Sequence, residues 1–114
     1  MVSELSDMKL IITIVERGKA EKIVDSAKKA GAPGATIMYG RGTGESEVLK
    51  FLKVSIEASK EIILVLAQED KLKEIVSAMV ETGKLKEPGT GILFTLPIDH
   101  LIGFNHRQYF NDIL

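Results

Sequence analysis

EIILVLAQEDKLKEIVSAMVETG, residues 61–83, carries the clearest secondary-structure signal in this chain. Residues 61–68 are mostly apolar and rich in β-branched side chains, which is typical of a buried strand. From residue 69 onward, apolar side chains recur at the i, i+3, i+4, i+7 and i+8 spacing of an amphipathic helix: Leu72, Ile75, Val76, Met79 and Val80. Gly83 is suited to end that helix, because glycine readily adopts the left-handed conformation found at helix C-termini. We therefore predict a strand followed directly by a helix.

The first half of the chain repeats this order. Residues 9–15, KLIITIV, predict a strand, and residues 18–30 predict a helix that Gly31 ends. Each half then closes on a further strand, ATIMYGRG at 35–42 and GILFTLP at 91–97. The sequence thus predicts two successive strand–helix–strand units.

A βαββαβ order is typical of the α+β, ferredoxin-like sandwich, in which two helices cover one face of a four-stranded antiparallel sheet. We expect residues 1–114 to form a single domain with its core at about 9–98, a connecting segment at 45–60 and a tail at 99–114. A chain of this length can bury a sizeable core of its own.

The strands predict an apolar second face of the sheet. They read as continuous apolar runs and not as alternating ones, which indicates that both faces are covered. Since two helices cover only one face, we expect a homo-oligomer that covers the other. The alternative is a monomer whose second face is polar.

The composition excludes several classes of function. The sequence has no cysteine and only two histidines, His100 and His106, so disulfides, thiolate catalysis and histidine-rich metal sites are not expected. A net charge of −1 and the absence of tryptophan provide neither the basic field nor the aromatic platform of nucleic-acid binding. The N-terminus, MVSELSDMKLIITIV, lacks a basic region, and its apolar run is too short for a signal or a membrane span. We therefore expect a cytoplasmic protein that does not bind nucleic acid.

No catalytic motif in the sequence is complete. A GxxxxGK[ST] phosphate loop would need a glycine at Ala78 and a serine or threonine at Leu85. The GxGxxG dinucleotide fingerprint would need a glycine at Glu45. The serines lie in no nucleophile-elbow motif, and the spacing of His100 and His106 fits surface residues better than a metal site. We therefore expect no enzyme activity, no resident cofactor and no metal site.

Glycines are concentrated in two stretches. They are Gly40, Gly42 and Gly44 after the second predicted strand, and Gly83, Gly89 and Gly91 around the start of the last one. Glycine permits positive φ and lets a ligand approach the backbone, where consecutive N–H groups can hold an anion. Taken alone, both stretches are better explained as turns.

Within the βαββαβ order, the two stretches resemble the PII signal-transduction family. GATIMYGRGTG, residues 34–44, resembles the family's second strand and the entrance to its T-loop. TGK at 82–84, followed by GTGILF at 89–94, resembles its Thr-Gly-Lys-x-Gly-x-Gly B-loop and the strand after it. The resemblance extends in order over residues 9–98. It implies a homotrimer with three clefts between subunits that bind adenine nucleotides, and regulation of a partner protein according to the nucleotide bound.

The resemblance also implies roles for particular residues. Thr36 and Ile63 would lie beside the adenine. Ribose and phosphate would be surrounded by Gly42, Thr43 and Gly44. Backbone donors from across the cleft would come from Gly83, Lys84, Gly89, Thr90 and Gly91.

Several positions depart from the family pattern in a way that removes positive charge. Ile92 stands where the family has a lysine that faces phosphate, and Glu45 stands where it has a basic residue. PIDHLIGF, residues 97–104, lacks the family's pair of arginines, and residues 86–88 are an insertion in the B-loop. Each lost cation removes a contact of about 1.5–3 kcal/mol, or roughly tenfold or more in affinity. We therefore predict that AMP or ADP binds in preference to ATP, with three candidate phosphate ligands remaining: Lys84, Lys86 and Arg107.

The segment 45–60 stands in the place of the family's T-loop. Its composition fits either a short helix or a strand near 53–57, and it lacks the tyrosine that is uridylylated in the family. Sensing of 2-oxoglutarate, which the family's T-loop supports, is therefore not expected. Loops on rigid scaffolds often carry contacts, so this segment is the candidate for binding a membrane transporter or a metabolic enzyme.

Two other interpretations fit the same sequence. One is a CutA-like trimeric metal-tolerance protein that uses His100, His106 and acidic residues. The other is a structural oligomer without a nucleotide ligand, whose glycines only make turns.

Overall fold

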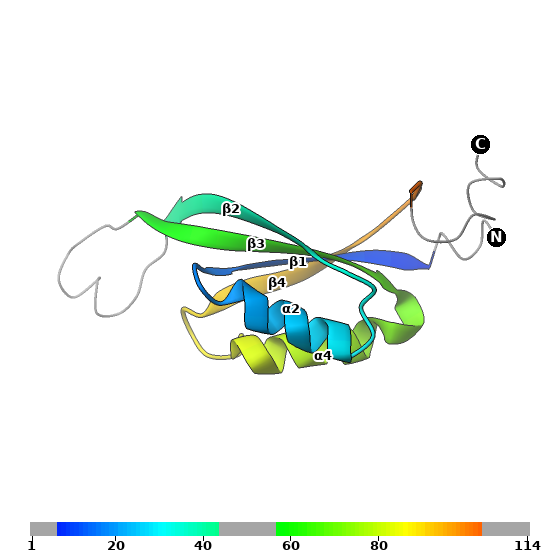
Figure 1. Cartoon of the computed structure of the whole chain (residues 1–114), viewed down its shortest axis with the longest axis horizontal. Coiled ribbons are helices and arrows are strands. Elements are labelled where there is room, and N and C mark those ends of the chain that lie inside the picture. The colour runs from blue at the N-terminus through cyan, green and yellow to red at the C-terminus, as the bar shows by residue number, and fades with distance from the viewer. Residues whose placement is uncertain (1–6, 44–56, 104–114) are drawn as a thin grey trace.

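The computed structural model describes residues 7–43 and 57–103 and confirms the βαββαβ order. The elements are β1 (Met8–Glu16), α2 (Ala20–Lys29), β2 (Thr36–Thr43), β3 (Glu57–Gln68), α4 (Glu69–Gly83) and β4 (Gly91–Pro97). The four strands form one antiparallel sheet in the order β2-β3-β1-β4, and both helices lie side by side on one of its faces (Figure 1). This is the predicted ferredoxin-like sandwich.

The core lies between the sheet and the helices. Alternate residues of β1 and β3 point toward the helices and have almost no exposed surface: Ile11, Thr13, Val15, Ile63, Val65 and Ala67. The helices contribute a matching apolar set: Ala20, Ile23, Val24, Ala27, Ile75 and Met79. Because the two central strands carry β-branched side chains at these positions, the helix side of the sheet packs as a continuous layer.

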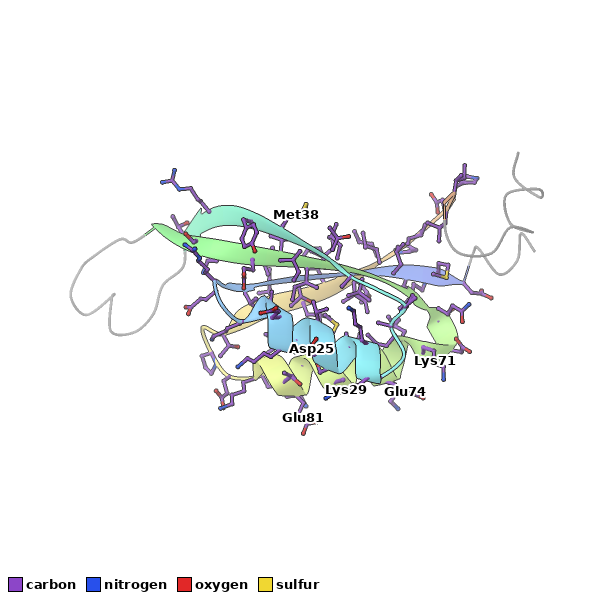
Figure 2. All side chains as sticks on the ribbon, in the orientation of Figure 1. Asp25, Lys29, Met38, Lys71, Glu74 and Glu81 are labelled. Atoms are coloured by element: carbon purple, nitrogen blue, oxygen red, sulfur yellow. The ribbon has the colours of Figure 1, made fainter. Side chains whose placement is uncertain are left out.

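The opposite face of the sheet, which we call the open face, is also apolar. It carries the residues that alternate with the core residues: Leu10, Ile12, Ile14, Thr36, Met38, Ile62, Leu64, Leu66, Ile92, Phe94 and Leu96. Ile92 is 57% exposed, and Leu96 is 45% exposed. Figure 2 shows Met38 on this face, whereas charged residues such as Asp25 and Glu74 lie on the helices. The expectation of an apolar second face is thus confirmed.

Strand β3 begins earlier than the sequence indicates. Its first residue is Glu57, so residues 57–60, which we assigned to the connecting segment 45–60, belong to the sheet. The reason is pairing: the ladder between β2 and β3 extends to the pair Thr43–Glu57 although the side chains there are polar. The expectations for residues 45–56 and for the tail from residue 104 lie outside the described residues.

Helix α2 begins two residues later than predicted and is capped from a distant strand. Gly18 has a φ of 96° and turns the chain, so the helix starts at Ala20. The side chain of Lys19, the N-cap residue, makes no capping bond. Instead, the carboxylate of Glu61 on β3 accepts the N–H groups of Gly18 at 2.7 Å and Ala20 at 2.9 Å. This buried contact satisfies free donors at the helix start, as a local cap would.

Gly83 does not have the left-handed conformation that we expected at the end of helix α4. Gly83 is the last helical residue, and the left-handed conformation is adopted by Lys84, at φ 54° and ψ 40°. A Cβ atom on Gly83 would lie 3.0 Å from Cδ1 of Ile23. Glycine is therefore needed here for close packing of α4 against α2, and the conformational strain falls on the lysine that follows.

Candidate functional site

Both glycine stretches lie at the same end of the sheet. Because all strands are antiparallel, β2 and β1 end where β3 and β4 begin, and the segment 84–90 lies at this end (Figure 1). The strand order, however, places β2 and β4 at opposite edges. With strands about 4.8 Å apart, the two stretches are separated by roughly 14 Å across the sheet. One stretch therefore lies at each edge of the sheet, at the same end.

The stretch before β4 is a compact turn held by its own hydrogen bonds. The hydroxyl of Thr90 lies 2.8 Å from the carbonyl oxygen of Lys84 and 2.9 Å from that of Glu87, so it can donate to either. The N–H of Lys84 donates to the carbonyl of Glu81. Thr90 therefore closes the loop with its side chain, and the Lys84 N–H, one of the predicted donors, is already occupied within the chain.

The other glycines of this turn have separate structural reasons. Gly91 has a φ of 145°, and a Cβ atom there would lie 2.6 Å from the carbonyl oxygen of Ile14. Gly89 has a φ of 77° with nothing within 4 Å of its missing side chain. Gly91 thus allows β4 to approach β1, while Gly89 leaves its backbone open to a ligand.

Gly40 and Gly42 leave room on the open face for a lysine. A Cβ atom on Gly42 would lie 3.3 Å from Cγ of Lys60, and one on Gly40 would lie 3.2 Å from Cδ1 of Ile62. Lys60 pairs with Gly40 on one side and with Glu16 on the other, so it lies in the last open-face row at this end that includes β1. We call Gly40, Gly42 and Lys60 the glycine row. Thr43 follows as the last residue of β2, and Gly44 lies outside the described residues.

Lys60 could not be identified as a candidate from the sequence. It lies in the polar stretch before residue 61, which reads as a loop, and its position beside the glycines depends on strand pairing. The signal that could have found it is alternation. Once β3 is extended to Glu57, Lys60 falls on the same face as Ile62 and Leu64.

Thr36 lies at the other end of β2, beside an apolar recess of about 410 Å³. The recess is lined by Leu10, Pro33, Gly34, Ala35, Thr36, Leu64 and Leu66. Gly42 is six residues further along the strand, which corresponds to roughly 20 Å. The structure therefore does not bring Thr36 close to the glycine row within one chain.

Ile63 is not on the open face. Its side chain has no exposed surface and packs in the core on the helix side. Thr36 pairs with Leu64, so Leu64, not Ile63, lies beside it in the recess. The sequence alone does not decide which of the two side chains faces the recess, because one residue of register reverses the face of every side chain in a strand.

Lys84 and Lys86 line a different groove. This groove, of about 600 Å³, is lined by residues of α4 and the turn after it: Val76, Ser77, Val80, Glu81, Lys84, Lys86 and Glu87. Two glutamates share it with the two lysines. Arg107, the third predicted phosphate ligand, lies outside the described residues.

The acidic side chains and His100 do not gather into a metal site in the described part of the chain. Within residues 7–43 and 57–103, no group of three or more His, Cys, Asp or Glu side chains is placed to hold a metal ion. His100 is exposed, and His106 lies beyond the described range. In the same part of the chain, neither helix is long and apolar enough to cross a membrane.

Comparison with known proteins agrees with the architecture. The sequence model of the family described as nitrogen regulatory protein P-II matches residues 8–107. The nitrogen fixation nifHD region GlnB-like protein 1 of Methanothermococcus thermolithotrophicus is 33% identical over 92 residues, covering 80% of this chain and 88% of that protein. The nitrogen regulatory protein P-II of Pyropia yezoensis is 29% identical over 100 residues, covering 83% and 89%.

A solved structure also matches the fold. The crystal structure of Arabidopsis thaliana PII bound to citrate has a TM-score of 0.64 and 22% identity, covering 82% of this chain and 78% of that one. The solved structure thus agrees with the ferredoxin-like fold, and the family match over residues 8–107 confirms the resemblance to the PII family. The chain belongs to the P-II family of nitrogen regulatory proteins.

Proposed function

We propose that this P-II family member is a cytoplasmic regulatory protein that binds an adenine nucleotide in clefts between the subunits of a homotrimer. AMP or ADP binds in preference to ATP. The bound nucleotide controls a partner protein, a membrane transporter or a metabolic enzyme, which is contacted through the segment 45–60. Catalysis has no part in this function.

The observation that carries the proposal is the separation of two complementary sites on one face. The apolar recess beside Thr36 suits an aromatic base, and the glycine row with Lys60 suits phosphate. Within one chain they are roughly 20 Å apart along β2, which is longer than a mononucleotide. A second copy packed on the apolar open face can bring its recess next to the glycine row of the first.

The same face supports the proposal of a trimer. The open face is a contiguous apolar surface across all four strands, with Ile92, Phe94 and Leu96 each more than 40% exposed. Surfaces of this kind on a small protein mark an interface. A ring of three copies gives each open face a neighbour and produces three equivalent clefts.

The preference for fewer phosphates follows from the charges around the cleft. Lys60 is the cation that the described residues place in the glycine row. One row further along the sheet, Ile92 pairs with Ile14 and presents an apolar side chain where the family has a lysine. Lys84 and Lys86 remain candidates for a terminal phosphate, but they share their groove with Glu81 and Glu87. A triphosphate therefore gains little from its additional charge.

Calorimetric titration of the purified chain with AMP, ADP, ATP and cyclic AMP tests the ligand. We expect AMP or ADP to bind more tightly than ATP, and Lys60→Gln to weaken binding by about tenfold or more because it removes a charged contact. The matched control Lys22→Gln, on the exposed surface of α2, keeps wild-type affinity. Absence of binding by all four nucleotides would refute nucleotide recognition.

Mixing two variants tests whether the site lies between copies. Thr36→Trp fills the recess, and Lys60→Glu reverses the charge of the glycine row, so each homotrimer alone is expected not to bind. In trimers reassembled from an equal mixture, roughly one quarter of the clefts combine an intact recess with an intact row. Recovery of about that share of ADP binding supports the proposal, whereas no recovery places both groups in one chain.

A further inference from the structure

The strand row that contains Lys60 also contains a carboxylate. Glu16, the last residue of β1, pairs directly with Lys60 of β3, which pairs in turn with Gly40 of β2. Side chains of directly opposite residues lie on the same face of a sheet, with Cβ atoms about 5 Å apart. The open face therefore places a glycine, a lysine and a glutamate side by side at this end.

The side chain of Lys60 lies toward β2 and away from Glu16. A Cβ atom on Gly42 would lie 3.3 Å from Cγ and 3.5 Å from Cε of Lys60, so the aliphatic part of the lysine covers the glycines. The strands β2 and β1 flank β3 on opposite sides. The exposed carboxylate of Glu16 is thus left on the other side of β3.

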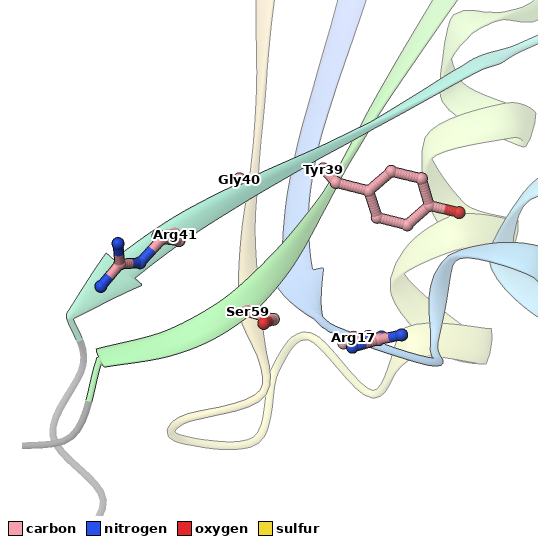
Figure 3. A pocket seen from close by; sticks show the side chains of 5 residues that line it. All are labelled: Arg17, Tyr39, Gly40, Arg41 and Ser59. Atoms are coloured by element: carbon pink, nitrogen blue, oxygen red, sulfur yellow. The ribbon is translucent and has the colours of Figure 1, made fainter.

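The arginine that follows Glu16 lies on the other face of the sheet. Arg17 lines a recess of about 450 Å³ together with Tyr39, which pairs with Glu61 on the helix side. Figure 3 shows the side chains of Arg17 and Tyr39 on the side of the sheet where the helices lie. The positive charge of Arg17 is therefore on the opposite face from the carboxylate of Glu16.

Glu16 also lies between the two glycine stretches. In the strand order β2-β3-β1-β4, β1 separates Lys60 from β4, the strand that the turn 84–90 enters. The ladder between β1 and β4 ends at the pair Val15–Gly91, one residue before Glu16. A chain of phosphates that starts at the glycine row and extends toward this turn must therefore pass over the end of β1.

We propose that Glu16 is the residue that limits the number of phosphates in the nucleotide site. This role rests on the proposed nucleotide cleft and gives its selectivity a specific cause. The first phosphate lies over the glycine row beside Lys60, whereas each further phosphate toward the turn 84–90 comes closer to the Glu16 carboxylate. Two like charges about 4 Å apart repel enough to weaken binding roughly fivefold even in water, and by more where water is excluded.

Calorimetric titrations of the full chain with AMP, ADP and ATP, without divalent cations, test this role through a ratio of affinities. In Glu16→Gln, we expect the affinity for ATP to rise by about fivefold or more, that for ADP by less, and that for AMP to stay within about twofold. The gain should shrink at high salt, because ions screen charges at an exposed site.

Two further variants are controls for the charge of Glu16. Glu16→Asp keeps the carboxylate and should keep the wild-type order of affinities. Glu74→Gln removes an exposed carboxylate from α4, on the helix side, and should leave all three affinities within about twofold. An equal gain in ATP affinity from Glu74→Gln would overturn the role of Glu16 in favour of a general charge effect.

The other outcomes separate this role from the nucleotide site itself. Equal gains for AMP and ATP in Glu16→Gln, or an unchanged affinity for ATP, would overturn the role of Glu16 and leave the cleft intact. Weaker binding of ATP by Glu16→Gln in the presence of magnesium would show that the carboxylate assists the ligand, and would also overturn it. If neither the wild type nor Glu16→Gln bound any of the three nucleotides, the cleft would be refuted together with its selectivity.

Discussion

The two faces of the sheet differ in how completely this chain covers them. On the helix side, Ile11, Ile63 and Val65 have no exposed surface, because α2 and α4 supply matching apolar side chains. On the open face, Ile92 and Phe94 are 57% and 41% exposed although the residues are no less apolar. One face is completed by the chain itself, and the other is proposed to be completed by further copies. Changes on the two faces should therefore alter different measurements.

The largest effect is expected from a charge on the open face. Phe94→Lys places an ammonium group in the middle of the proposed subunit interface, where it would have to be desolvated without a partner. We expect complete loss of the trimer in analytical ultracentrifugation, with the circular dichroism of a folded chain retained. Lys73→Glu, an exposed change on α4, is the control and should leave the assembly intact. A trimer that survives Phe94→Lys would mean that the copies meet elsewhere.

The corresponding change on the helix side is Ile63→Ala. Ile63 is fully buried in the core, so its truncation leaves a cavity and should lower the free energy of unfolding by about 2–5 kcal/mol. Urea denaturation at several protein concentrations measures this loss. It should appear at every concentration, because the cavity lies inside one chain. A loss that vanished at high concentration would place Ile63 in an interface and contradict its position.

A smaller effect is expected where the two layers are joined, at Glu61. Glu61→Ala leaves the N–H groups of Gly18 and Ala20 without their acceptor, and should lower the free energy of unfolding by about 1–3 kcal/mol. Hydrogen exchange should accelerate at these two amides first. Glu21→Ala, an exposed change in the first turn of α2, is the matched control. Equal effects of the two substitutions would show that helix charge, and not the distant cap, matters.

The smallest effect, and one of opposite sign, is expected at Lys84. This residue holds a φ of 54°, so Lys84→Gly should relieve strain and raise the free energy of unfolding by about 1 kcal/mol. Thermal unfolding measures the gain. Lys86→Gly, which removes the same charge from the same groove, should give no such increase. If Lys84→Gly is stabilising and also weakens ADP binding, we infer that the strained Lys84 contributes to nucleotide binding.

The helix side of the sheet was predictable because its signals are local. The spacing of Leu72, Ile75 and Met79 predicts α4, and β4 runs from Gly91 to Pro97 as the glycine and the proline indicate. Gly31 also ends the first helix region with positive φ, as expected. Helix periodicity and chain-breaking residues act over a few positions, so a single sequence contains them.

The parts that could not be predicted depend on contacts between distant segments. Glu61 caps a helix that begins 41 residues earlier in the chain, and nothing in the residues near Glu61 indicates that role. Which of Ile63 and Leu64 faces the recess depends on the register of β3, which the apolar run itself leaves open. Residues 57–60, which are mostly polar, join the sheet because β2 continues beside them. Pairing, not composition, decides these positions.

The alternation of Ser59, Lys60 and Glu61 has a consequence for how the chain can change in length. Ser59 lies on the helix side of the sheet, Lys60 lies in the glycine row on the open face, and Glu61, again on the helix side, caps α2. An insertion of one residue between Lys60 and Glu61 would move every earlier residue of β3 to the wrong face, while two residues would restore the faces. We therefore expect relatives of this protein to differ by any number of residues between Thr43 and Glu57. Within the start of β3, insertions and deletions should contain only even numbers of residues.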